Sequence, residues 1–269
     1  MANKKQMYTQ DQIELMNSNL EKLHHVLLCM LQDFKNICQE NNLTWIGAYG
    51  TALGAVRHHG FIPWDDDLDI CMPRNDLERL CTIVQTQYAD KYKIMNSSID
   101  SNYSLATSRF MLKGTVFRDS SLRTAKFESC IFLDLFPLDN ISDSFFKSQK
   151  QIWLSWFFNK MATVKAFDKP HIAAKGFKAS LFQAGLKIAQ LLMRMPYIKH
   201  MDFNAQYKKY LTMYSDIETK RMGYPCDTTP FMSIYQNEDL FPCQYLKFET
   251  IEIPVPHKVK ELLASTYGD

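Results

Sequence analysis

Four of the five residues in Asp65–Asp69 are aspartates, and this segment runs directly into the apolar residues Ile70–Met72. Polar and apolar residues alternate from Asp67 to Ile70, which is the pattern of a β-strand with one face against a core. The carboxylates of Asp67 and Asp69 would then share one face, with their Cα atoms about 7 Å apart. Because burying an unpaired carboxylate is costly, the fold must hydrate these groups, pair them or supply a cation.

This acidic run has two interpretations, a solvated turn or a binding site for a hard divalent cation. Mg²⁺ takes oxygen ligands and is commonly shared between carboxylates and substrate phosphates. Without a cation, carboxylates at this density repel one another and raise each other's pKa. The flanking apolar residues hold the aspartates beside a core, so we favour Mg²⁺, with Mn²⁺ as the alternative, bound by Asp67 and Asp69.

Asp134 is a further candidate ligand, because it stands among apolar residues in the expected strand Ile131–Leu135. A buried aspartate in such a run needs a partner or a metal. Asp134 would complete a two-metal site. Asp139, a few residues on, fits better as a capping residue at a strand end.

Four of the nine glycines lie between residues 47 and 60. We expect Tyr49-Gly-Thr51 to end a strand and to begin a helix over Ala52–Arg57, with Thr51 as its N-cap and Gly60 as its terminator. Free N–H groups at such a helix start bind phosphate. Gly50, Thr51 and Arg57 are therefore candidate substrate-binding residues. Three more are weaker, since exposed strand side chains explain them equally well: Arg109, Lys113 and Thr115.

Short apolar runs between turn residues predict strands, and longer periodic stretches predict helices. The expected strands are Thr44–Tyr49, Leu68–Met72, Ser108–Leu112, Thr115–Arg118 and Ile131–Leu135, with helices over 9–40 and near Asn75–Gln87. This mixture predicts an α+β fold. We divide the chain into an N-terminal amphipathic helix that packs on the core (1–42), a catalytic core (43–140), a basic, aromatic-rich helical subdomain (141–221) and a C-terminal segment (222–269). The last segment carries a β-like run at Lys247–Val255 and a helix from about His257.

The net charge of +2 is too even for a nucleic-acid-binding protein. It conceals an asymmetry, because residues 141–221 carry 14 Lys and Arg against 5 Asp and Glu, a charge of +9 that leaves −7 for the remainder. The aromatic run Phe145–Phe158 lies in this basic stretch. It forms either core or a surface on an anionic membrane, so peripheral membrane contact through 145–221 stays open.

The seven scattered cysteines form no C-x-x-C pair, which argues against a zinc site and against a disulfide framework. The first residues lack the apolar stretch of a secretory signal. No run of 18 uncharged apolar residues occurs, so we expect no membrane-spanning helix. These features favour a reduced, cytoplasmic protein.

The segment Gly50–Asp69, GTALGAVRHHGFIPWDDDLD, resembles the signature of the LicD family. That family contains bacterial phosphorylcholine transferases, is related to the fukutin-type ribitol-phosphate transferases, and falls in the nucleotidyltransferase superfamily. Further matches are Lys113-Gly-Thr115, Asp134-Leu-Phe-Pro-Leu-Asp139, Phe248-Glu249, Pro254-Val-Pro256 and Tyr267-Gly-Asp269. His59 departs from the family, which commonly has lysine there, and relatives usually continue past the position of Asp269 with aromatic and proline residues.

The resemblance implies a nucleotidyltransferase-like mixed sheet flanked by helices, with 141–221 as a basic helical insertion and 222–269 completing the domain. It implies Mg²⁺-dependent transfer of a phospho-alcohol from a CDP-linked donor, with release of CMP. The favoured phospho-alcohol is phosphorylcholine, with CDP-choline as its donor. The acceptor would be a sugar hydroxyl of a lipopolysaccharide, capsule or teichoic acid precursor, including a lipid-linked glycan. Asp67 and Asp69 would hold the metal with help from Asp65, and Asp134 would bind a second metal or accept the hydroxyl proton.

Two alternatives remain open. One is a nucleotidyltransferase that moves a nucleoside monophosphate from an NTP to a small molecule. The other is a non-enzymatic family member that binds a membrane or a glycosyltransferase. The carboxylates Asp67, Asp69 and Asp134 argue against this last possibility. Choline, ribitol and glycerol all remain candidates for the alcohol.

Overall fold

The computed structural model describes residues 10–117, 129–166, 185, 193, 195, 198 and 200–268, with only the backbone for 10–17. Arg118, Asp269 and most of 167–199 lie outside the described residues, so these parts of the expected strand, C-terminal motif and basic subdomain are not described. Among the described helices, none has the length and hydropathy needed to cross a membrane.

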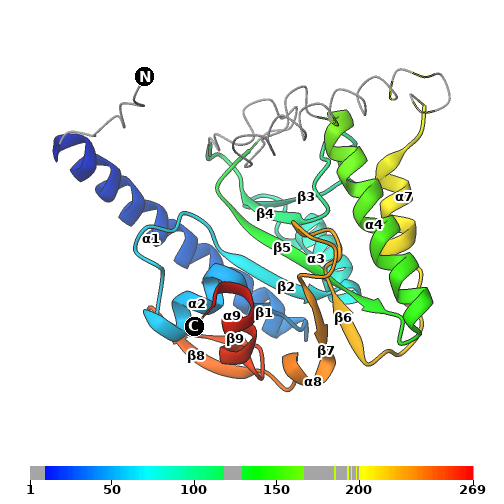
Figure 1. The fold of residues 1–269 in the computed structure, drawn as a ribbon. Helices are drawn as coiled ribbons and strands as arrows, with labels where there is room; N and C mark the ends of the chain where they lie inside the picture. Colours follow the sequence, from blue (N-terminus) through cyan, green and yellow to red (C-terminus); the bar gives the residue numbers. More distant parts are fainter. Residues whose placement is uncertain are drawn as a thin grey trace, which may run out of the picture.

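A mixed seven-stranded sheet forms the centre of the fold (Figure 1). Its strands are β1 (Ile46–Gly47), β2 (Asp69–Pro73), β3 (Tyr92–Met95), β4 (Ser108–Leu112), β5 (Phe132–Ile141), β6 (Arg221–Gly223) and β7 (Ile234–Gln236). The main order is β1-β2-β5-β4-β3, and β6 and β7 extend the sheet from the end of β5. Among the strand pairs of the described residues, only β2–β5 is parallel. This parallel pair is the part of the sheet that positions the site.

Helices surround the sheet, and a two-stranded hairpin lies at one end. The helices are α1 (Gln10–Glu40), α2 (Tyr49–Arg57), α3 (Arg74–Gln87), α4 (Phe145–Ala166), α7 (Phe203–Leu211), α8 (Asn237–Leu240) and α9 (Val259–Tyr267). The hairpin pairs β8 (Gln244–Phe248) with β9 (Ile251–Val255). Helix α9 lies beside α2, while α4 and α7 pack together at the far end of the sheet (Figure 1).

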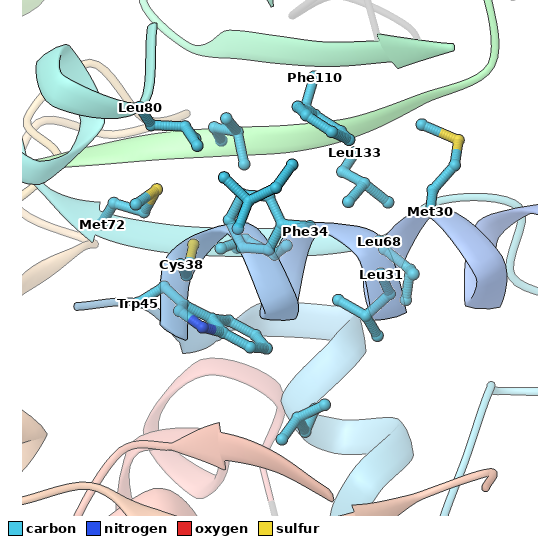
Figure 2. Packing of buried hydrophobic residues seen from close by; sticks show 14 of the residues in the cluster. Met30, Leu31, Phe34, Cys38, Trp45, Leu68, Met72, Leu80, Phe110 and Leu133 are labelled. Carbon is cyan, nitrogen blue, oxygen red and sulfur yellow. The ribbon is translucent and has the colours of Figure 1, made fainter. Parts of the chain in front are cut away.

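The main core lies between α1, α3 and one face of the sheet. Leu27, Leu31, Phe34 and Cys38 recur at helical spacing, and all four are buried because this spacing places them on one face of α1. Figure 2 shows Phe34 reaching toward the strand residues Leu133 and Phe110. The expected packing of an N-terminal amphipathic helix against the sheet is thus explained by its apolar stripe.

The α+β prediction is confirmed, with differences in the element bounds. The strand Ser108–Leu112 matches, and the hairpin and α9 account for the predicted C-terminal β run and helix. The expected strand Thr44–Tyr49 is wrong at its end, since β1 stops at Gly47 and α2 begins at Tyr49. Residues 115–117 form no strand. Strands β3, β6 and β7 were not predicted, because each is only three or four residues long. Each pairs with a neighbouring strand of the sheet.

A candidate active site at the parallel strand pair

Three carboxylates meet where β2 and β5 begin to pair. Asp69 is the first residue of β2, Asp134 is its register partner on β5, and Asp67 stands two residues before Asp69. One carboxylate oxygen from each lies within 4.8 Å of the others. Asp67 precedes the strand rather than lying in it, but the spacing of two residues still brings its side chain to the side of Asp69.

Burial and mutual repulsion raise the pKa values of this group. Burial, followed by the charges of Asp65 and Asp134, raises the pKa of Asp67 to about 7. Burial and the charges of Asp67 and Asp134 raise the pKa of Asp69 well above its usual value. Converging, half-buried oxygen donors that repel one another are a donor set that fits a hard divalent cation. The residues present therefore fit Mg²⁺ or Mn²⁺.

Asp65 lies beside the same group, at the end of the loop that follows α2. Its side chain crowds Gly50, where an added Cβ would lie 2.7 Å from Asp65 Oδ2. The Nε2 of His24 donates to the Asp65 carbonyl oxygen at 2.6 Å, and the His24 ring stacks on Phe61. Helix α1 thereby fastens the acidic loop. Sequence reasoning missed His24, because its partners lie some forty residues away.

The start of α2 borders the carboxylates, but not with the predicted cap. Ala48 occupies the N-cap position without a side-chain cap bond. Thr51 is instead buried, and its Oγ1 accepts a hydrogen bond from the Asp69 backbone N–H at 2.8 Å. The Gly50 backbone also hydrogen-bonds to Asp69 and stabilises the charged form of its carboxylate. Thr51 therefore ties α2 to β2, and Gly50 presents its backbone to the site.

The predicted termination of this helix by Gly60 is also wrong. Helix α2 ends at Arg57, and the left-handed backbone conformation falls at His59, with φ 54°. Both glycines are needed for space, since a Cβ at Gly60 would lie 2.0 Å from Glu249 Oε1 and a Cβ at Gly54 would lie 2.4 Å from the Gly60 carbonyl oxygen. The close approach of these two glycines folds the loop back along α2 toward Asp65.

Arg109 is buried on β4, opposite Asp134 in the antiparallel register. Its Nε donates to Asp134 Oδ1 at 3.0 Å, and its guanidinium carbon lies 3.6 Å from the centre of the Phe132 ring. Its Nη1 is buried and has no hydrogen-bond partner within the described part of the chain. The alternative of an exposed strand side chain is therefore wrong for Arg109.

The other three predicted phosphate-binding residues lie elsewhere. Arg57 is exposed in the last turn of α2, about 12 Å along the helix from its start. It lines a hollow of about 150 Å³ with Lys260 and Tyr267. Lys113 is exposed and donates to the Ala89 carbonyl oxygen. Thr115 fastens the chain after β4, donating to one backbone carbonyl and accepting from one backbone N–H.

Two residue groups near the site were not predicted as functional. Tyr49 has a left-handed backbone, with φ 43°, and its hydroxyl donates to Ser233 Oγ at 2.8 Å and to Asp227 Oδ2 at 3.3 Å. Tyr267 of α9 has its pKa raised by burial and by the nearby charges of Asp69 and Asp65. Local sequence carries no signal for the first group, whereas Tyr267 lies in a motif quoted for the family.

Comparison with known proteins bears directly on this geometry. A family model described as the LicD/FKTN/FKRP nucleotidyltransferase domain matches residues 42–173. Over these residues the chain is similar to the LicD family. The matched region contains all four candidate metal ligands and Arg109. The hairpin, α9 and the segment between β6 and β7 (residues 224–233), which we call the Asp227 loop, follow it.

Curated relatives show the same similarity. Lipopolysaccharide cholinephosphotransferase LicD of Haemophilus influenzae is 29% identical over 117 residues, which cover 43% of each chain. Two uncharacterized proteins, of Rickettsia typhi and Rickettsia prowazekii, are 43% and 45% identical over 56 and 47 residues. These matches cover 21% and 18% of this chain and 18% of each relative. The chain therefore aligns with less than half the length of the curated relatives that it matches.

Proposed function

We propose that the protein is a Mg²⁺-dependent phosphotransferase. It would transfer a phospho-alcohol from a CDP-linked donor to a sugar hydroxyl of a cell-surface glycan precursor, and release CMP. Phosphorylcholine is the phospho-alcohol that we favour. The observation that carries this proposal is the convergence of Asp67, Asp69 and Asp134 beside the start of α2. Such a site suits a diphosphate, whose charge needs a cation on one side and N–H donors on the other.

The residues divide the work between the metal and the donor. Asp67 and Asp69 would hold the metal, with Asp65 assisting. Bound there, Mg²⁺ would neutralise charge on the transferred phosphoryl group and on the departing CMP. Gly50 would offer backbone to the diphosphate, and Thr51 would keep α2 fixed against β2 through its bond to Asp69.

Arg109 is the strongest candidate for phosphate contact among the basic side chains. Its Nε donates a hydrogen bond to Asp134. Its Nη1 is a buried donor that could donate to a phosphate oxygen. Arg57 contributes at most from the edge of the site, beside Tyr267. Lys113 and Thr115 would act indirectly, by holding the chain that follows β4.

The reaction that we propose is a single displacement at phosphorus. The acceptor oxygen forms a bond to the phosphorus that carries the alcohol, and the bond from that phosphorus to the bridging oxygen of CMP breaks. CMP leaves with the bonding electrons, and the hydroxyl proton passes to a base. Asp134 would accept that proton or hold a second metal, and its position on β5 suits both roles.

The choice of choline and of a glycan acceptor is supported by the name of the Haemophilus influenzae relative, a lipopolysaccharide cholinephosphotransferase. A teichoic acid or capsule precursor has the same reacting hydroxyl. We place the protein in the cytoplasm, with peripheral contact to the membrane through residues 145–221. Such contact would bring a lipid-linked acceptor to the enzyme.

A donor screen tests the proposal. The protein is incubated with Mg²⁺, a cell-envelope extract and one nucleotide at a time: CDP-choline, CDP-ribitol, CDP-glycerol or CTP. We expect CMP from one CDP-alcohol and label from its alcohol in the glycan fraction. Release of pyrophosphate from CTP alone would support nucleotidyl transfer instead, and no nucleotide cleavage would favour a non-enzymatic role.

A further inference from the structure

Helix α4 has its polar residues inside and its aromatic residues outside. Four of the buried residues on its inner face are polar: Ser148, Gln151, Ser155 and Asn159. Gln151 is fully buried and bonds backbone groups of Asn140, Ser142 and Leu211. These bonds satisfy the polar part of the inner face, where Ile152 and Ala162 are also buried. Phe158 packs inward against α7, and most of the other aromatic side chains of the helix lie on its outer face.

The outer face is a narrow stripe at helical spacing. Phe146, Lys150, Trp153 and Phe157 fall within about 60° of one another at 100° per residue. Phe146 is 82% exposed, Trp153 48% and Phe157 47%. A contiguous patch of exposed aromatic rings on a surface helix is costly in water and typically marks an interaction surface.

A loop from another part of the chain extends this stripe. The Phe231 ring lies 5.7 Å from the Trp153 ring, edge to face, and both Phe231 and Met232 are more than 40% exposed. We call the stripe together with Phe231 and Met232 the aromatic face. It is formed by two segments that are more than seventy residues apart in sequence, so tertiary packing assembles it.

The charge on this helix matches an anionic surface. Helix α4 carries four lysines, Lys147, Lys150, Lys160 and Lys165, and no Asp or Glu. Lys147 and Lys150 are exposed beside the aromatic rings, and the acidic Asp143 stands just before the helix. Tryptophan and phenylalanine next to lysine are the side chains that settle at the headgroup level of a bilayer.

The aromatic face is linked to the candidate active site through the Asp227 loop. The Trp156 Nε1 donates to the Asp227 carbonyl oxygen at 3.1 Å, and the Asp227 carboxylate accepts from Tyr49, the residue before Gly50. In Figure 1 the segment that precedes β7 lies against α4. A surface that contacts α4 and this loop would therefore lie close to the start of α2.

We infer that the aromatic face docks on the headgroup region of a bilayer rich in anionic lipid, and so presents the site to an acceptor held in that membrane. The aromatic rings would enter the headgroup layer while Lys147 and Lys150 pair with lipid phosphates. This inference deepens the proposed peripheral membrane contact and rests on it.

Vesicle sedimentation tests the inference without any nucleotide. The full chain is mixed at low salt with vesicles of phosphatidylcholine, or of phosphatidylcholine and phosphatidylglycerol in equal amounts. We expect binding to the anionic vesicles only, and a loss of about tenfold in the partition coefficient for Lys150→Glu and for Phe146→Ser/Phe157→Ser. Tyr245→Ser is the matched control, since Tyr245 is 66% exposed on β8, away from α4 (Figure 1).

Three outcomes would overturn the inference. One is no binding by the wild-type protein at low salt, and another is an equal loss in Tyr245→Ser. The third is a wild-type dimer in gel filtration that Phe146→Ser/Phe157→Ser converts to a monomer, because a second copy would then cover the face. CMP release from soluble CDP-choline, measured on the same variants, reports separately on the proposed function.

Discussion

Asp69 of β2 and Asp134 of β5 are direct register partners in two parallel strands. Neighbouring strands lie about 4.8 Å apart, so the backbone holds the two carboxylates at a separation where they repel each other. Asp67 adds a third oxygen to the group. Proton uptake relieves this repulsion in part, as the raised pKa values of Asp67 and Asp69 show, and Arg109 offsets the charge of Asp134. A divalent cation relieves it while the carboxylates stay charged.

Added Mg²⁺ should therefore raise the melting temperature of the protein. Binding to the folded state alone at a hundredfold excess over the dissociation constant contributes about 2.7 kcal/mol, or roughly 5–10 °C for a chain of this size. Differential scanning fluorimetry with and without EDTA measures the shift. Asp69→Asn should lose most of it. Asp66→Asn should keep it, since Asp66 is exposed and converges with Asp65 and Asp67 rather than with Asp69 and Asp134. A full shift in Asp69→Asn would contradict the ligand assignment.

The Arg109–Asp134 ion pair should be strongly coupled, because the Arg109 side chain is buried and that of Asp134 nearly so. Arg109→Met removes the guanidinium from Asp134 and from the Phe132 ring. Because Asp134 is then left among other carboxylates, we expect a loss of about 3 kcal/mol in the free energy of unfolding. Urea denaturation of both single variants and of Arg109→Met/Asp134→Asn gives the coupling. The double variant should lose clearly less than the sum, and additive losses would refute the coupling.

Tyr49→Phe should impair turnover more than stability. The substitution removes the hydroxyl bonds to Ser233 and Asp227 but keeps the ring beside Phe136. We expect a loss of about 1 kcal/mol in unfolding free energy. Because the left-handed backbone of Tyr49 sets the direction of Gly50, kcat for CMP release should fall by about tenfold with a smaller change in KM. An unchanged kcat would mean that the hydroxyl serves the fold alone.

The hydrogen bonds that Asp33 of α1 accepts from Lys91 and Tyr92 should make the free energy of unfolding depend on pH in the acid range. Burial raises the pKa of Asp33, but hydrogen bonds from Lys91 and Tyr92, both 2.6 Å long, outweigh burial and lower it below its usual value. A carboxyl with a lowered folded-state pKa stabilises the protein above its unfolded pKa, and this stabilisation is lost as pH falls through the folded value. Asp33→Asn should thus be less stable than wild type at neutral pH and equally stable near about pH 2. A difference independent of pH would contradict this.

The elements nearest the site were predictable where one stretch of sequence decides the structure. The apolar spacing of Leu27, Leu31 and Phe34 predicts α1, and the alternation around Asp69 places two carboxylates on one side. The pairing of β2 with β5 depends on topology, which alternation does not encode. Asp134 was therefore predicted as a candidate from its apolar neighbours, and only the fold makes it the partner of Asp69.

Local reasoning was wrong where a tertiary contact outweighs a local one. Thr51 has the side chain of an N-cap, yet its hydroxyl accepts from the Asp69 N–H at the start of β2 instead. The bond from Tyr49 to Asp227 spans 178 positions. The Phe145–Phe158 run left core and surface open, and the burial of Gln151 turns most of its rings outward.

CMP release from the CDP-alcohol that the donor screen selects is the most direct test of the central proposal, measured with Mg²⁺ on wild type, Asp67→Asn and Asp66→Asn. Both variants remove one charge from neighbouring positions of the same loop. Asp67 converges with Asp69 and Asp134, whereas Asp66 converges only with Asp65 and Asp67 among the described residues. We expect Asp67→Asn to remain folded and to lose at least about a thousandfold in turnover, while Asp66→Asn stays near wild type. Wild-type turnover by Asp67→Asn, or an equal loss in both variants, would contradict the proposed site.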